Sequence, residues 1–205
     1  MAFTSYKNIT DVLQAFILDY QEQEFVELLS PHLDQFFLSR LNLVLQEGIV
    51  YNSEYAICEN IISPILTEIW RSYTKDLLIW SHQPLNYDEN LSGTPDYIVA
   101  RRSTRGKIIL EKPYVILVEA KKDNFEEGWG QCLAEMVAAQ ALNGDSGEQP
   151  QRLFGVVSNG KLWEFGVLQA KMFTKNIRYF GLQNVPELMG VLNFIFAESL
   201  TQGQY

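Results

Sequence analysis

Cysteine and histidine are scarce in this 205-residue sequence, which contains two of each. Cys58 and Cys132 lie 74 positions apart and form no Cys-x-x-Cys pair, so the sequence predicts neither a disulfide framework nor a zinc knuckle. His32 and His82 leave little material for a histidine metal site, and a lone histidine is most often structural. Histidine-based metal binding and general-base catalysis are therefore set aside.

Long apolar runs are also missing. The longest, such as residues 115–118, fall far short of the roughly 20 residues that span a bilayer. The opening Met-Ala-Phe does not begin a signal peptide, so we expect a cytoplasmic protein with no membrane partner. With 47% apolar and 13% aromatic residues, the composition is that of a compact globular chain whose core needs no disulfide or metal.

An excess of basic residues is absent too, since the formal net charge is −9. The acidic excess lies in residues 1–90, which hold 13 acidic and 4 basic residues, whereas residues 91–205 hold 12 of each. A negatively charged partner would therefore meet the second half of the chain. The alternative is a solvated basic rim on a hairpin. The bases that lie close together in sequence are Arg101, Arg102, Arg105, Lys107, Lys121 and Lys122.

Apolar residues recur at helical spacing through the first 73 residues. The pattern predicts two helices between about residues 8 and 46, joined at Pro31. A third helix is predicted from 54 to 73, with Ser53 as its N-cap and a kink at Pro64. We take residues 1–50 as an N-terminal helical extension and residues 51–205 as an α/β domain, the two forming one compact domain overall.

After residue 90 the spacing changes to that of strands. The pattern predicts, in chain order, a hairpin, a central strand buried on both faces, a helix, a second hairpin, a further strand and a C-terminal helix. Asn159-Gly160 predicts a type I′ turn in the second hairpin. These elements cover residues 96–110, 114–119, 129–143, 153–168, 172–180 and 186–196.

Two acidic residues and a lysine stand at the ends of predicted strands. Asp96 begins the first hairpin, and Glu119 and Lys121 end the central strand, Glu119 lying 23 residues after Asp96. Because side chains alternate along a strand, Glu119 and Lys121 project to the same face while Ala120 points into the core. Carboxylate oxygens suit Mg²⁺ or Mn²⁺, and Lys121 can position or help to deprotonate a water that attacks a phosphate.

Each of these pieces is common by itself, because a Glu-x-Lys is expected about once by chance in a chain of this length. The order of elements adds weight: a helix with an acidic start, a hairpin with Pro-Asp, a buried strand ending in Glu-x-Lys, then a helix and another strand. The alternative without function is a surface aspartate and an exposed Glu-Lys strand end.

With these residues the sequence resembles the PD-(D/E)XK nuclease superfamily, and it is most similar to the N-terminal nuclease domains of type I restriction motor subunits. The resemblance implies an α/β fold with a restriction endonuclease-like αβββαβ core, in which helices flank a mixed central sheet. We expect an N-terminal helical extension and a C-terminal helix around this core. The resemblance spans residues 53–168 and rests on Ser53-Glu54, residues 61–66, Gly93-Thr94-Pro95-Asp96-Tyr97, Val118-Glu119-Ala120-Lys121-Lys122, Gly130-Gln131 and residues 158–165.

The resemblance also implies roles for the residues at the strand ends. Asp96 and Glu119 would be metal ligands for Mg²⁺ or Mn²⁺, with the carbonyl of Ala120 as a third. Lys121 would be the catalytic lysine.

The early helix of the family usually adds another acid, and the sequence offers Glu54 and Glu59. They stand about 140° apart around a helix, so one of them should be solvated. We favour Glu54 as a metal ligand because it shares a row with Cys58 and Ile61 that should face the sheet.

Gln131 stands where related nucleases carry a helix glutamine that contacts DNA or the metal site. Many relatives carry an aromatic residue four positions later, whereas this chain has Glu135, which weakens the case for substrate contact. A polar helix residue without a functional role is the alternative for Gln131.

The sequence thus predicts a metal-dependent phosphodiesterase that cleaves DNA, as a restriction or DNA-processing component. Gln131, Arg101 and Arg105 are its predicted substrate contacts. An acidic chain must concentrate its few bases or borrow charge, so we expect a helicase, a methyltransferase, another DNA-targeting protein or a homodimer to assist. The alternative is a noncatalytic DNA-binding or protein-interaction module that keeps the nuclease fold, and the intact Asp96, Glu119 and Lys121 argue against it.

Overall fold

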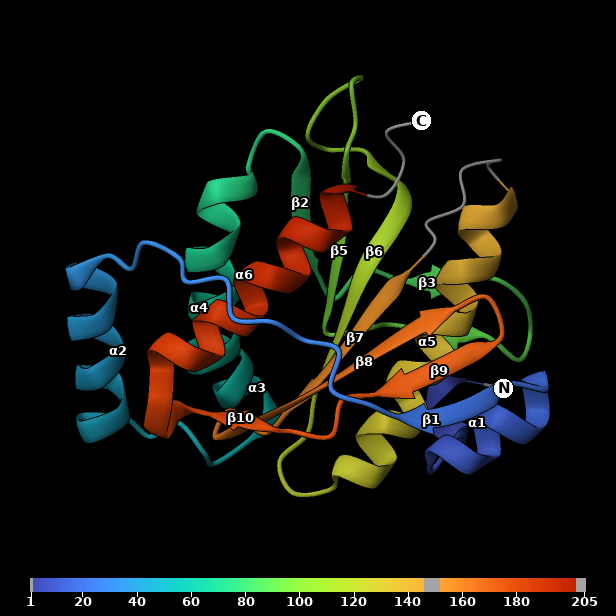
Figure 1. Ribbon diagram of the computed structural model, residues 1–205, viewed down its shortest axis with the longest axis horizontal. Helices are drawn as coiled ribbons and strands as arrows, with labels where there is room; N and C mark the ends of the chain where they lie inside the picture. The colour runs from blue at the N-terminus through green and yellow to red at the C-terminus, as the bar shows by residue number, and fades with distance from the viewer. Residues whose placement is uncertain (1, 146–151, 202–205) are drawn as a thin grey trace.

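A mixed β-sheet forms the centre of the protein, whose computed structural model describes residues 2–145 and 152–201. Its strands are β1 (Asp19–Glu22), β2 (Leu77–Ser81), β5 (Tyr97–Arg102), β6 (Leu110–Ala120), β7 (Leu153–Ser158), β8 (Leu162–Gln169), β9 (Met172–Lys175) and β10 (Phe180–Gly181). Their order is β1-β9-β8-β7-β6-β5-β2, with β10 beside β8 (Figure 1). The pairs β6/β7 and β1/β9 are parallel, and the other pairs are antiparallel. Two short strands, β3 (Leu85–Asn86) and β4 (Ser92–Gly93), pair apart from this sheet.

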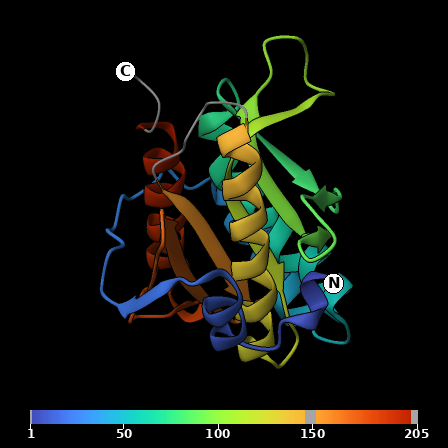
Figure 2. The same ribbon diagram turned by 90° about the vertical axis from the view of Figure 1, so that its right-hand side faces the viewer.

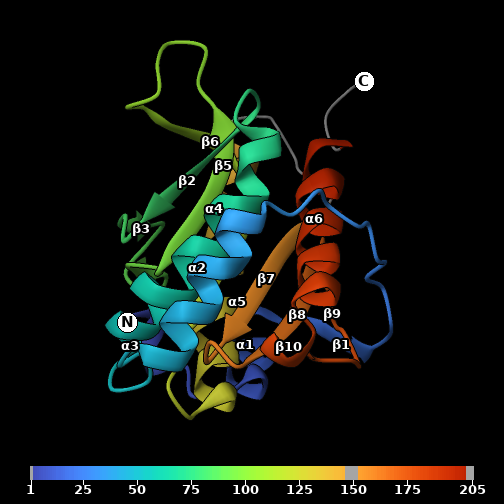
Figure 3. The same ribbon diagram turned by 90° about the vertical axis from the view of Figure 1, so that its left-hand side faces the viewer.

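Helices cover both faces of the sheet. The helical elements are η1 (Phe3–Ser5), α1 (Ile9–Phe16), α2 (Gln35–Glu47), α3 (Glu54–Ile57), η2 (Cys58–Ile62), α4 (Ser63–Trp70), η3 (Arg71–Tyr73), α5 (Phe125–Asp145), η4 (Leu182–Asn184) and α6 (Val185–Thr201). Figure 2 shows α5 lying along one face with the N-terminal helices at its lower end, and Figure 3 shows α2, α4 and α6 on the other face. None of the described helices is long and apolar enough to cross a membrane.

The two faces of the sheet bury separate apolar clusters, and β5 shows how the sequence divides between them. Tyr97 and Val99 belong to the cluster under α2, α4 and α6. Ile98 and Ala100 belong to the cluster under α1 and α5. All four side chains are buried, as expected for alternating residues of a central strand covered on both sides. The predicted α/β fold class, with helices flanking a mixed sheet and a C-terminal helix, is confirmed.

The helical run over residues 54–73 was expected, and its kink takes the form of a π turn. The Ser53 hydroxyl accepts from the Ala56 N–H over 3.1 Å and so caps the helix start. The five residues of η2 form the π turn, which ends immediately before Ser63 and Pro64. Proline has no N–H to continue the regular ladder, so the wider turn precedes it.

The N-terminal region differs from the two helices expected between residues 8 and 46. Helix α1 ends at Phe16 and is followed by Ile17, whose φ is 54°; β1 then pairs in parallel with β9 and forms the edge of the sheet. Regular helix resumes only at Gln35, beyond Pro31. The predicted helix over the intervening residues is therefore wrong.

Tertiary contacts explain this difference, because they satisfy the backbone that a helix would otherwise satisfy. The Asn176 side chain accepts from the Phe25 N–H over 3.0 Å. The Leu29 N–H donates to the Gly190 carbonyl over 3.2 Å, and the Asn193 amide donates back to the Leu29 carbonyl over 2.9 Å. Partners distant in sequence therefore override the local helical spacing.

Two smaller expectations also need correction. Strand β2, which pairs with β5, was not predicted, because a short apolar run such as residues 77–80 does not distinguish strand from helix. The hairpin at Asn159-Gly160 is present, but only Gly160 has a positive φ, of 80°, so the turn is not type I′. The Asn159 side chain instead accepts from the N–H groups of Lys161 and Leu162 over 3.0 and 2.8 Å.

Candidate functional site

The ends of β5 and β6 bring Asp96 beside the Glu119-Ala120-Lys121 segment. Tyr97, the first residue of β5, pairs with Val118 in β6, so Asp96 lies next to the residues that end β6. The Ala120 N–H donates to Asp96 Oδ2 over 2.7 Å. In Figure 1 this meeting point is at the lower end of β6, before the chain turns into α5.

Glu119 and Lys121 share one face of β6 and form an ion pair. The Lys121 Nζ lies 2.9 Å from Glu119 Oε1, and the two side chains are 15% and 7% exposed. Ala120 is buried in the cluster on the opposite face, under α2, α4 and α6. The pair therefore faces α5, on the side of the sheet where a third element can complete the site.

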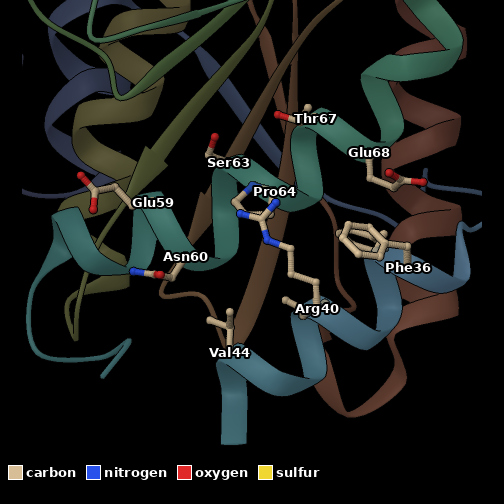
Figure 4. A pocket seen from close by; sticks show the side chains of 11 residues that line it. Phe36, Arg40, Val44, Glu59, Asn60, Ser63, Pro64, Thr67 and Glu68 are labelled. Carbon is tan, nitrogen blue, oxygen red and sulfur yellow. The ribbon is translucent and has the colours of Figure 1, made fainter. Parts of the chain in front are cut away.

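Of the two acids in the early helix, the structure brings Glu54 to the site. Glu54 begins α3, and its Oε1 accepts from the Lys122 N–H over 3.2 Å. Glu59 is instead among the residues that line a cavity of about 290 Å³ between α2 and the helix 54–70, and Figure 4 shows its carboxylate directed away from Arg40 and Val44. Glu54 is thus the helix acid that accompanies Asp96.

Burial and mutual repulsion govern the charges of this cluster. Burial raises the pKa of Asp96, although the Ala120 N–H and the charge of Lys121 partly offset that rise. Burial and then the charge of Asp96 raise the pKa of Glu119. Burial alone would lower the pKa of Lys121, but Glu119, together with the charges of Glu54 and Asp96, outweighs burial and raises that pKa. The site therefore holds a charged lysine between carboxylates that resist ionisation.

Helix α5 contributes Glu135, which sequence analysis did not place in the site. Glu135 is 2% exposed, and burial followed by the charge of Glu119 raises its pKa well above the ordinary value. Glu135 therefore lies close to Glu119 and resists ionisation beside it. An acid among the buried apolar residues Cys132, Leu133 and Met136 was the signal in the sequence that could have found it.

Gln131 lies one helical turn before Glu135 and is 5% exposed. Residues four apart lie on the same side of a helix, so Gln131 and Glu135 share one side of α5. The Gln131 Oε1 and Glu135 Oε2 atoms are buried with no hydrogen-bond partner among the described residues. Two orphaned oxygens next to buried carboxylates are unusual, because buried polar atoms are normally paired.

His82 also reaches the site, although the scarcity of histidine had set it aside. Its Nε2 lies 3.3 Å from Asp96 Oδ1. No local pattern marks this residue, because it follows β2, the strand that the sequence did not reveal. Only the pairing of β2 with β5 brings it to Asp96.

The two arginines predicted to contact substrate are not brought to this cluster. Arg101 is five residues along β5 from Asp96, a separation of roughly 17 Å in a strand, and its guanidinium donates to the Ser199 and Leu200 carbonyls over 3.2 and 2.9 Å. It therefore caps the C-terminal end of α6. Arg105 lies beyond β5, 3.5 Å from Glu111. A DNA contact by either arginine stays a prediction.

The donor set of the site suits a hard cation that keeps water ligands. In residues 2–145 and 152–201 no three His, Cys, Asp or Glu side chains gather closely enough to hold a metal ion by themselves. Mg²⁺ is usually held by one or two carboxylates and several waters. Asp96 and Glu119, with Glu135 close to Glu119, fit that requirement better than the closed set of four ligands that structural zinc takes.

Comparisons with known proteins add little to this geometry. No protein-family model matches the chain, and no curated protein matches it. Among solved structures, a chain of the cryo-EM structure of the DrdV–DNA complex is similar, with a TM-score of 0.42 and 12% sequence identity. The match covers 78% of this chain and 13% of the DrdV chain. A likeness this weak does not bear on function, which has to come from the site itself.

Proposed function

We propose that the protein is a phosphodiesterase that cleaves DNA with the help of Mg²⁺ or Mn²⁺. The observation that carries the proposal is the convergence of Asp96, Glu119 and Lys121 at one edge of the sheet, with Glu54 on the adjoining helix. Two carboxylates beside a lysine provide both a cation site and a positive group for the reacting phosphate.

Each residue has a distinct task in this proposal. Asp96 and Glu119 hold the cation, with the Ala120 carbonyl as a third donor and Glu54 completing the negative charge around it. The ion, when bound, neutralises charge that builds on the phosphate and makes a nearby water easier to deprotonate. Lys121, the charged group at the centre of the cluster, orients the attacking water and the phosphate oxygen. Because Glu119 forms an ion pair with Lys121, a cation on Glu119 would compete with the lysine for the same carboxylate.

The direct test is cleavage of circular, linear and single-stranded DNA with Mg²⁺, with Mn²⁺ and with chelator. We expect cleavage that needs the metal and that Asp96→Asn abolishes without loss of fold. Glu54→Gln is expected to weaken cleavage, whereas Glu59→Gln, a matched change on the same helical run, leaves it intact. No cleavage of any substrate would favour the noncatalytic DNA-binding or interaction module instead.

Substitution of Lys121 is expected to impair catalysis without impairing metal binding. Lys121→Ala should still bind Mn²⁺ in a calorimetric titration, because it removes a competitor for Glu119. Its cleavage rate should fall by roughly 10²-fold or more, as expected when one positioned charged group is lost. An unchanged rate would remove Lys121 from the mechanism.

The charge of the chain bears on its partners. DNA affinity comes largely from lysine and arginine on phosphates, and the net charge here is −9. Exposed Lys122 and Lys161 follow the ends of β6 and β7, two parallel strands that end at the same edge of the sheet. We propose that these few bases give weak DNA binding alone, and that a helicase, a methyltransferase, another DNA-targeting protein or a second copy of the chain strengthens it. Cleavage with and without an added candidate partner tests this.

A further inference from the structure

His82 stands where the chain leaves β2 and passes the start of β5. Its backbone N–H donates to the Asp96 carbonyl over 2.9 Å. Its φ is 51°, in the left-handed region that residues other than glycine rarely adopt. This bend places the imidazole beside the Asp96 side chain and not in line with β2.

The imidazole links two side chains. The Ser81 Oγ lies 2.6 Å from Nδ1, and Asp96 Oδ1 lies 3.3 Å from Nε2. The approach of Nε2 to Asp96 Oδ1 is an ion-pair contact, and the Ser81 hydroxyl is hydrogen-bonded to Nδ1 on the other side of the ring. The three side chains therefore form one series from Ser81 through His82 to Asp96.

Two tyrosines flank the same ring. The ring centroids of Tyr55 and Tyr97 lie 6.2 and 6.1 Å from that of His82. The Tyr97 hydroxyl donates to the Cys58 carbonyl in the π turn over 3.2 Å, which joins β5 to the helical run that carries Glu54 and Tyr55. The tyrosines and Ser81 therefore restrain the imidazole of His82, whose side chain is 41% exposed.

With this arrangement each oxygen of Asp96 has a defined neighbour. Oδ2 accepts from the Ala120 N–H and Oδ1 faces His82 Nε2. Each carboxylate oxygen has two acceptor positions, so each retains one for a cation. The plane of the carboxylate is thus set before any ion arrives.

We propose that His82 is a positioning residue, which holds Asp96 in the orientation that binds the cation, with Ser81 fixing the ring. This inference rests on the proposed function, because it assigns a task to the same metal site. Groups that orient a metal ligand through a hydrogen bond commonly contribute 10- to 100-fold, by order of magnitude, to metal affinity. A neutral imidazole is sufficient for this task.

The test is a calorimetric titration of the full chain with Mn²⁺, which needs no DNA and no turnover. We expect His82→Leu to weaken Mn²⁺ binding by roughly 10- to 100-fold. His82→Gln, whose amide can donate from about the position of Nε2, should restore most of the affinity. Both variants place a non-glycine residue at the same positive φ, so they share its backbone cost. His32→Leu, at the other and exposed histidine, is the control and should bind as the wild type does.

The outcomes distinguish this inference from the proposed function. If the wild type binds Mn²⁺ and His82→Leu binds it with the same affinity, the positioning role is overturned and the proposed metal site is not. A wild type that binds no Mn²⁺ overturns both. If circular dichroism shows that His82→Leu does not fold, the Mn²⁺ affinity of Ser81→Ala is compared with that of the wild type instead. Equal Mn²⁺ affinity in those two would overturn the series from Ser81 to Asp96.

A second readout excludes a merely structural role. The Mn²⁺ concentration that gives half-maximal DNA cleavage should rise in His82→Leu, and cleavage at saturating Mn²⁺ should recover most of the wild-type rate. A rate that stays low at every Mn²⁺ concentration, with unchanged Mn²⁺ affinity, would contradict the proposal.

Discussion

Glu135 lies close enough to Glu119 in the interior of the protein that the charge of Glu119 raises the pKa of Glu135, and both side chains are buried. Two carboxyl groups in contact cannot both ionise cheaply, so the pair shares a proton. The proton resides on Glu135, because burial is most complete there and Lys121 lies against Glu119. A proton on Glu135 and the charge of Lys121 thereby offset the negative charge of Glu119.

The shared proton makes stability depend on pH. Unfolded Glu135 loses its proton above its ordinary pKa of 4.5, whereas the native protein keeps it, so raising the pH above that value lowers the free energy of unfolding. The cost is about 1.4 kcal/mol for each unit by which the native pKa exceeds the unfolded one. The Glu135→Gln substitution removes this free-energy cost, because glutamine carries no titratable proton.

Thermal unfolding in chelator, from about pH 5 to about pH 8, measures this effect. The Tm of Glu135→Gln minus that of the wild type should increase as the pH rises. Glu126→Gln, an exposed change in the first turn of α5, is the control and should show a constant difference. A constant difference for Glu135→Gln as well would mean that Glu135 is ionised in the native protein.

Gly128 gives the stem of Lys121 its room. A Cβ at this position would lie 2.9 Å from Lys121 Cγ and 2.7 Å from Val157 Cγ1, closer than real contacts allow. We expect Gly128→Ala to displace Lys121 and to lower the DNA cleavage rate by at least about 10-fold, a modest share of the roughly 10²-fold expected for losing the lysine.

Gly144→Ala is the matched control, because it lies in the same helix and a Cβ there meets nothing within 4 Å. Both changes gain the same helix propensity, about 1 kcal/mol, so a difference between them reports the contact with Lys121. Cleavage rates and Tm values of the two variants make the comparison. Equal rates would show that Lys121 can move aside without loss.

The position of the bases predicts which of them meets DNA. Lys122 adjoins the carboxylate cluster, whereas Arg105 lies beyond the far end of β5. We expect Lys122→Glu to weaken DNA binding. The slope of log K against log salt concentration should become shallower by about one unit, the amount expected for the loss of one phosphate contact. Arg105→Glu should have a smaller effect on the slope. Fluorescence anisotropy over a salt series measures both, and an equal loss in the two variants would extend the DNA contact along the hairpin.

Much of the core followed from the sequence because its signals are local. Helical spacing and the Ser53 cap placed the run 54–73, and a continuous apolar segment placed the central strand β6. Strand alternation put Glu119 and Lys121 on one face, and the ion pair between them follows from that alternation. These features depend on residues within a few positions of one another, so a pattern can reveal them.

The tertiary structure decided the rest. Arg101 looked like part of a basic patch, yet β5 brings it to the end of α6, where bare carbonyls accept its hydrogen bonds. The segment near Leu29 has helical spacing, but Gly190 and Asn193 supply hydrogen-bond partners for its backbone, and it forms no helix.

The same distinction runs through the candidate site. The sequence by itself determined that two carboxylates and a lysine stand at the ends of strands, and strand geometry accounts for Glu119 and Lys121. Only the pairing of β2 with β5 brought His82 to Asp96, and only the packing of α5 on β6 buried Glu135 against Glu119. Those contacts join residues that are far apart in sequence and are related by no helical or strand spacing. Their physical cause is the pairing and packing of whole elements.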